Sequence, residues 1–173
     1  PVCSYSQRVI QGGLILNKKI MLKNKIKHIR IEFPEPWYRV SKFHIPKNST
    51  EARFSLSYCL AISLLNGKFD LDSLNINKNK KVFNLIKKIK LDTYQVPKNF
   101  EDYDPKYPDI ITVILKDKSI FKEKVFDIKG GKNSPLSNED IRKKFIMCGG
   151  NISILNKIIN NDNINRKLNT LIF

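Results

Sequence analysis

Histidine, cysteine and long apolar runs are all scarce in this sequence of 173 residues. It holds two histidines and three cysteines, Cys3, Cys59 and Cys148, with no CxxC pair and no histidine at ligand spacing. Widely spaced cysteines in odd number argue against a disulfide framework or a zinc site and favour buried, reduced thiols in a cytoplasmic protein. The apolar runs 60–65 and 110–115 are far shorter than the roughly 20 residues that span a bilayer, so we expect no membrane partner.

Sequence motifs of the common enzyme classes are absent as well. No HExxH, GxSxG, GxxxxGK[ST] or GxGxxG pattern occurs, and the glycine pairs lack the context of a phosphate-binding loop. The only histidines, His28 and His44, lie sixteen residues apart and do not by themselves make a site. We expect no metal and no other cofactor, and these residues alone indicate no reaction.

Charge of one sign dominates what is present. The net charge is +16, but 26 of the 32 basic residues are lysine, whereas forked recognition of bases and phosphates favours arginine. Lysine, asparagine and isoleucine share A/T-rich codons, so a coding bias explains the charge without a selected partner. Two alternatives stay open. The first is a basic field that attracts a di- or tricarboxylate, and the second, which we rank lower, is binding of nucleic acid.

Length and composition predict one folded domain with an appended segment. An apolar fraction of 41% with 10% aromatic residues is ordinary for a globular protein. We expect a domain over residues 1–150, followed by a carboxyl-terminal helix and tail over 151–173.

Periodicity in the first half predicts a helix, a strand and a second helix. Apolar residues recur at helical spacing over 9–21 and alternate with polar ones over 26–33. Gly12 and Gly13 lie inside the first helix, which suggests the close approach of another backbone and a packing role there. Asn48 and Glu51, three residues apart, are typical of a helix start, and they precede a largely apolar run over 52–66 that we expect to be the central core helix.

The second half predicts a further helix, a hairpin and two short helices. A lysine-rich amphipathic helix is expected over 80–89, and three prolines and three tyrosines make 93–108 an irregular connection. Strand-like runs at 110–115 and 120–128 predict a hairpin, and helices follow near 137–147 and 152–159. Helices and strands mix without strict βαβ alternation, so the fold class is α+β with a mostly antiparallel sheet and packed helices.

Several segments together resemble one enzyme family. The opening residues 1–10 (PVCSYSQRVI), the run 51–58 (EARFSLSY) closed by Asn66-Gly67, the hairpin 111–117 (ITVILKD) and the capped helix start at 135–140 (PLSNED) occur in the order and spacing of the MmgE/PrpD family. The similarity is to the smaller, carboxyl-terminal, lid-type domain of that fold and covers nearly the whole chain.

The resemblance implies a cofactor-independent lyase acting on a di- or tricarboxylate. Members dehydrate 2-methylcitrate or decarboxylate cis-aconitate, and the dehydratase-like activity is the first expectation here, the decarboxylase-like one its alternative. In the family a helical amino-terminal domain supplies much of the active site. We therefore expect this chain to be incomplete and inactive alone, to need a helical domain on the same longer chain or a separate polypeptide, and to be able to form a homodimer.

The resemblance also implies site residues. Tyr38 occupies the position of a tyrosine that lines the site in decarboxylases, and we expect it to donate a hydrogen bond or a proton to substrate; a packed loop tyrosine beside Trp37 is the alternative. Ser4 and Arg8 stand where some relatives carry histidine, which weakens the decarboxylase reading, although Arg8 can clamp a substrate carboxylate. Lys118 replaces a turn glycine common in the family.

Two readings compete with an active lyase. In the first, the chain is an inactive family fragment. In the second, which ranks a distant third overall, it is a basic module that holds single-stranded RNA through its lysines with Trp37 and Tyr38.

Overall fold

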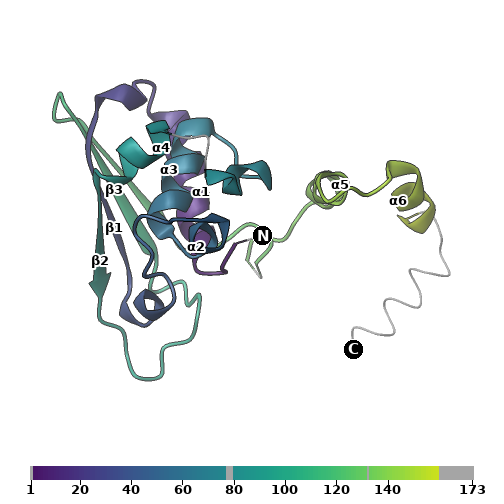
Figure 1. The fold of residues 1–173 in the computed structure, drawn as a ribbon. Helices are drawn as coiled ribbons and strands as arrows, with labels where there is room; N and C mark the ends of the chain where they lie inside the picture. The colour runs from purple at the N-terminus through teal and green to yellow at the C-terminus, as the bar shows by residue number, and fades with distance from the viewer. Residues whose placement is uncertain (1, 77–79, 132, 160–173) are drawn as a thin grey trace. The chain divides into compact units, whose positions relative to one another are not determined.

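A computed structural model describes residues 2–76, 80–131 and 133–159 (Figure 1). It divides into two compact units, residues 1–129 and 130–173, which are described separately. The predicted tail after residue 159 lies outside the described residues. The predicted domain boundary at residue 150 stays a prediction.

The first unit is built on a four-stranded mixed sheet in the order β2-β1-β3-β4. Its strands are β1 (Ile26–Pro34), β2 (Ile89–Tyr94), β3 (Asp109–Leu115) and β4 (Ile120–Val125). β1 pairs antiparallel with β3, and β3 pairs antiparallel with β4, whereas β1 and β2 run parallel. The α+β class with a mostly antiparallel sheet is therefore confirmed.

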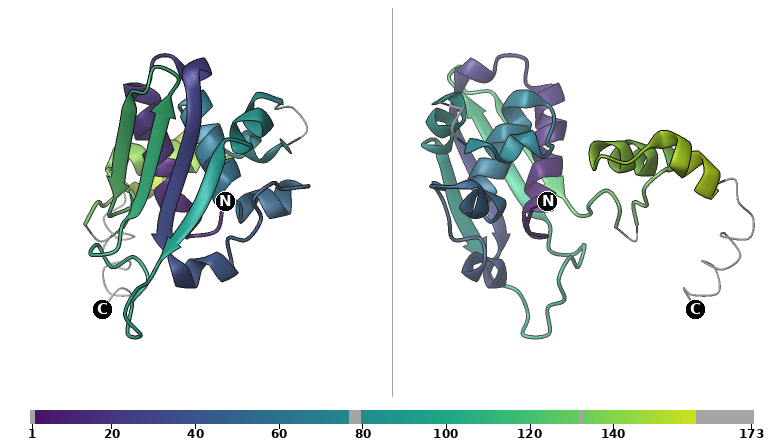
Figure 2. Two further views of the ribbon diagram at one scale, coloured as in Figure 1. Left: turned by 90° about the vertical axis from the view of Figure 1, so that its left-hand side faces the viewer. Right: turned by 45° about the vertical axis from the view of Figure 1, so that its right-hand side comes forward.

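Helices cover one face of this sheet, as both views of Figure 2 make clear. They are α1 (Ser6–Lys19), α2 (Ser49–Arg53), α3 (Leu56–Asn66) and α4 (Lys80–Ile86), with the 3-10 turns η1 (Lys23–Lys25), η2 (Glu35–Arg39) and η3 (Asp72–Leu74). α3 is the central core helix that the sequence predicts, because every residue from Leu56 to Leu64 is buried. Its first turn is capped by the Ser55 hydroxyl, which accepts from the Tyr58 N–H at 3.1 Å.

Three sequence expectations need correction. The helix expected over 52–66 is two helices, since Phe54 and Ser55 interrupt it and Ser55 begins a new N-cap. Asn48 does cap α2, but the Glu51 carboxylate accepts from the Lys47 N–H and not from Asn48. The helix expected to reach residue 89 ends at Ile86, and Ile89 begins β2, which pairs with β1 and takes residues 93 and 94 from the expected loop.

The two glycines of α1 explain how closely it packs. A Cβ on Gly12 would overlap the Ile111 side chain of β3, and one on Gly13 would overlap the Ser63 hydroxyl of α3. The predicted packing role is thus confirmed, but the expected approach of another backbone is wrong, because the nearest atoms belong to side chains. The apolar core between α1, α3 and the sheet includes Val9, Leu16, Ile29, Ile31 and Val113, all fully buried.

The second unit holds two helices, α5 (Asn138–Met147) and α6 (Ile152–Ile159). α5 begins with the capping box predicted for Ser137 and Asp140, in which each side chain accepts from the other's backbone N–H. The Gly149 N–H donates to the Ile146 carbonyl and the Gly150 N–H to the Phe145 carbonyl, which ends α5 where the sequence predicts.

Candidate functional site

Aromatic and acidic side chains gather where α1 begins. Tyr5, one residue before α1, stacks on Trp37 of η2 with ring centroids 4.9 Å apart. Asp102, from the segment after β2, accepts from the Tyr5 hydroxyl at 2.8 Å and from the Trp37 Nε1 at 2.9 Å. One carboxylate therefore ties together two segments that each carry a predicted site residue, Ser4 beside Tyr5 and Tyr38 beside Trp37.

Arg8 lies at the centre of this cluster and is fully buried. Its guanidinium carbon sits 5.2 Å from the Trp37 ring centroid and 5.3 Å from that of Tyr103. Its NH1 donates to the Tyr107 carbonyl at 2.8 Å and lies 3.9 Å from Asp109, the first residue of β3. The cation thus lies beside two neighbouring rings whose centroids are 5.4 Å apart, and cation–π attraction is strongest where water is excluded.

Several polar atoms of the cluster lack hydrogen-bond partners. Among the described residues, the Nε and NH2 of Arg8, the Tyr103 hydroxyl and both carboxyl oxygens of Asp109 are buried and unpartnered. Burial raises the pKa of Asp109 to about 8, and neighbouring Arg8 offsets only part of that rise. The raised pKa favours the protonated carboxyl group of Asp109, which weakens it as a counter-charge to Arg8. An unsatisfied buried donor typically costs about 1 to 3 kcal/mol, so this arrangement is expensive.

Tyr103 adds backbone strain at the same place. Its φ is +67°, a left-handed conformation that bulky side chains rarely adopt. Its ring lies 5.4 Å from Trp37 and 6.1 Å from Tyr5. The hydrogen bond to Asp102, more than any other contact, raises the pKa of Tyr5 to about 12, so its phenol stays protonated and keeps donating.

The structure places the three predicted site residues differently. Ser4 is exposed and Tyr38 is 51% exposed, with its ring 6.4 Å from Phe33, whereas Arg8 is enclosed. Ser4 and Arg8 flank the start of α1, and Tyr38 follows the tryptophan that stacks over Arg8. Arg8 faces an internal carboxyl group in this conformation, so its role with a substrate carboxylate stays a prediction, as do the roles of Ser4 and Tyr38.

The histidines lie in different surroundings. His28 is exposed on β1. His44 is half-buried, with its Nδ1 2.8 Å from the Ser57 hydroxyl oxygen. Burial lowers the pKa of His44, which favours the neutral imidazole.

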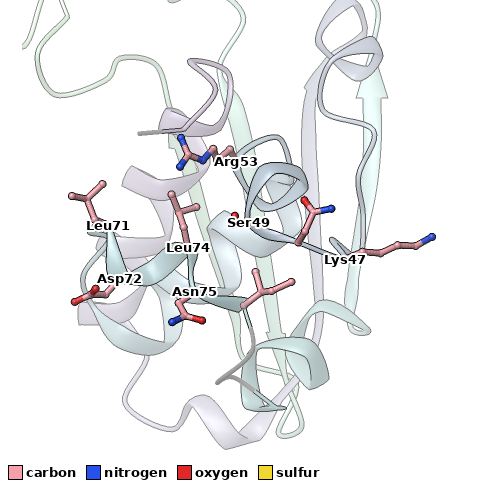
Figure 3. A pocket seen from close by; sticks show the side chains of 9 residues that line it. Lys47, Ser49, Arg53, Leu71, Asp72, Leu74 and Asn75 are labelled. Atoms are coloured by element: carbon pink, nitrogen blue, oxygen red, sulfur yellow. The ribbon is translucent and has the colours of Figure 1, made fainter.

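A hollow of about 610 Å³ opens between α2 and η3 (Figure 3). Its lining mixes basic, acidic, amide and apolar groups: Lys47, Asn48, Ser49, Arg53, Leu71, Asp72, Leu74, Asn75 and Ile76. None of Ser4, Arg8 and Tyr38 is among these lining residues, so the hollow is separate from the predicted site.

Metal-binding and membrane features are not found in the described part of the chain. No group of three or more His, Cys, Asp or Glu side chains there is arranged to hold a metal ion. No described helix has both the length and the apolar character needed to cross a bilayer. All three cysteines are free, with Cys59 buried and Cys148 exposed.

Sequence reasoning missed the acidic members of the cluster, Asp102 and Asp109. Both belong to or border the segment 93–108, which we interpreted only as an irregular connection. Its density of tyrosine and acidic residues was the one available signal, because its partners lie far away in sequence: Tyr5 and Asp102 are 97 residues apart.

Comparison with known proteins identifies the family. A family model described as the MmgE/PrpD C-terminal domain matches residues 1–156. Cis-aconitate decarboxylase of Mus musculus is 34% identical over 122 residues, which are 69% of this chain and 24% of that protein. Cis-aconitate decarboxylase of Homo sapiens is 29% identical over 139 residues, 79% of this chain and 28% of that protein. The chain thus spans about a quarter of the length of these curated relatives, and it belongs to the MmgE/PrpD family as a C-terminal domain.

Proposed function

We propose that this chain is the C-terminal domain of a cofactor-independent lyase that acts on a di- or tricarboxylate, with cis-aconitate decarboxylation as the first candidate reaction. The observation that carries the proposal is the similarity to two proteins named cis-aconitate decarboxylase. This reverses the order expected from sequence, in which dehydration of 2-methylcitrate came first; that reaction remains the second candidate.

The proposed chemistry needs groups that hold carboxylates and groups that move a proton. Arg8 is assigned to a substrate carboxylate, because its guanidinium has two donors without acceptors. Ser4 is assigned as a second donor to substrate, and its exposure before α1 supports that role. Tyr38 is assigned as the hydrogen-bond or proton donor, supported by its half-exposed ring on the neighbouring turn η2.

The remaining catalytic groups are assigned to a helical amino-terminal domain, on the same longer chain or on a separate polypeptide. The span of about a quarter of the relatives' length supports this, since most of each relative has no counterpart here. Positions 4 and 8 carry serine and arginine, not histidine. The proton transfer that a histidine there would provide is therefore assigned to other residues. We further propose a cytoplasmic location and the capacity to form a homodimer.

Loss of cis-aconitate and of 2-methylcitrate over time tests the proposal. The chain is assayed alone and mixed with a helical MmgE/PrpD domain, and turnover is expected only in the mixture. Within the mixture, Tyr38→Phe is expected to lower kcat by about a hundredfold, which is the low end of the range for loss of a general acid or base. Phe43→Leu, in the loop after η2, is the control and should retain activity. Absence of turnover of both substrates in the mixture would favour an inactive family fragment.

A further inference from the structure

The segment 95–108, which joins β2 to β3, closes over Arg8. Tyr103 from this segment lies over the guanidinium, the Tyr107 carbonyl accepts from its NH1, and Asp102 fastens the segment to Tyr5 and Trp37. The Arg8 side chain has no exposed surface in this arrangement. A carboxylate from solution therefore cannot reach it unless one of the covering groups moves.

The closed arrangement leaves its polar groups poorly satisfied. The Nε and NH2 of Arg8 are buried without acceptors. A carboxylate is the ligand that matches such a vacancy, because its two oxygens accept from a guanidinium in parallel. The unpaired donors thus point to a ligand of that chemistry and to a second state in which it is bound.

Tyr103 is the covering group best placed to move. Trp37 lies in η2, is 1% exposed and packs on Tyr5, and Asp109 is the first residue of β3. Tyr103 instead lies in an irregular segment and carries the positive φ of +67°. Strain of this kind persists only where surrounding contacts impose it, and it is released when those contacts separate.

We propose that residues 95–108 form a cap that shields Arg8 and opens, by displacement of Tyr103, to admit a carboxylate of the substrate. The proposal rests on the function proposed above, since it takes Arg8 as the carboxylate-binding residue. It adds a regulated step: binding at Arg8 competes with the ring of Tyr103. Arg8 would then exchange an internal environment with missing acceptors for a paired one.

Calorimetric binding of tricarballylate, an unreactive tricarboxylate, tests the cap on the chain alone. Tyr103→Gly removes the covering ring and suits a positive φ, so it is expected to bind about tenfold more tightly than the unaltered chain. Lys118→Gly is the matched control, because Lys118 has a φ of +71° in the β3–β4 turn, at the opposite end of β3 from the cap. It relieves similar strain and should leave the affinity unchanged. Tyr103→Asn, which also tolerates this conformation, repeats the test if the glycine variant is unstable.

Hydrogen exchange in the unaltered chain gives an independent readout. Tricarballylate is expected to speed amide exchange in residues 95–108, where turn hydrogen bonds join Phe100 to Pro97 and Tyr107 to Asp104. A ligand that merely settles on a fixed surface would slow it. Equal or weaker binding by both Tyr103 variants, unchanged or slower exchange, or no binding by any variant would overturn the cap. Lyase turnover with such a result would discard the cap alone, whereas tighter binding without turnover would discard the lyase assignment alone.

Discussion

The sheet core and the Arg8 cluster are neighbours in the first unit and are built on opposite principles. Ile31, Leu60 and Val113 in the core are fully buried and apolar, and α1 approaches through glycines that leave no excess space. Arg8 and Asp109 in the Arg8 cluster are fully buried as well, yet five side-chain atoms of Arg8, Tyr103 and Asp109 lack a hydrogen-bond partner. The core is consistent with a region optimised for stability. The cluster holds groups that folding alone would not require, and such costly placements concentrate at functional sites.

The largest expected effect of a single substitution at fixed pH is a break in the core. Ile31→Ala should lower the free energy of unfolding by about 3 kcal/mol, because it removes buried methyl groups and leaves a cavity. Chemical denaturation followed by the fluorescence of the single tryptophan, Trp37, measures it. Ile45→Ala is the control, since Ile45 is 52% exposed and should cost less than about 0.5 kcal/mol. Equal losses in both variants would contradict this core.

A smaller loss is expected where α1 meets α3. Gly13→Ala should cost about 2 kcal/mol by overpacking against the Ser63 hydroxyl, which donates to the Cys59 carbonyl. In a double-mutant cycle, Ser63→Ala should recover most of this loss, because it removes the overlapping hydroxyl oxygen and leaves only the tight contact of 3.0 Å to the Ser63 Cβ. Additive losses would show that the two residues are not in contact.

The cluster should give the chain a distinctive pH dependence. The pKa of Asp109 is raised in the folded protein, so its carboxyl keeps a proton that the unfolded chain releases. Its contribution to stability is then full below about pH 4 and is lost as pH rises toward 8, on the order of 1 kcal/mol per pH unit. Urea unfolding between those limits measures it, and Asp109→Asn should remove this part of the slope. A contribution from Asp109 that instead grew with pH would mean that it is ionised in the folded state.

The subtlest effect concerns the link that Asp102 makes. Asp102→Asn should lower the pKa of Tyr5 toward the ordinary value of a tyrosine, because the neutral amide no longer stabilises the protonated phenol. Ultraviolet titration of tyrosinate, with Tyr5→Phe subtracted to isolate one phenol, measures the shift. Asp104→Asn is the matched control in the same segment. An unchanged pKa of Tyr5 in Asp102→Asn would mean that Asp102 does not fasten the segment 95–108 to Tyr5 at the start of α1.

The same contrast explains what the sequence could predict. Helical spacing and caps locate α1, α3 and α5, and alternation locates β1 and the β3–β4 hairpin, since these features are local. β2 is missed because Ile89 continues the apolar spacing of α4, and only pairing with β1 makes it a strand. The break at Ser55 is missed because the apolar run continues across it.

The candidate site was less predictable than the fold. Family resemblance indicated Ser4, Arg8 and Tyr38, but an arginine in a helix reads as a surface residue, and nothing local shows that Arg8 is enclosed. Its ring and acidic neighbours come from segments up to 101 residues away along the chain, as with Asp109. Contacts of that range are set by the completed sheet and cannot be read from spacing.

A chimaera gives the most direct test of the central claim that this domain serves a carboxylate lyase. Residues 1–156, the part matched by the family model, would replace the corresponding part of cis-aconitate decarboxylase from Mus musculus. The predicted result is release of carbon dioxide from cis-aconitate, at a rate that Tyr38→Phe lowers by about a hundredfold. A folded chimaera that binds no carboxylate and releases no carbon dioxide would contradict the account.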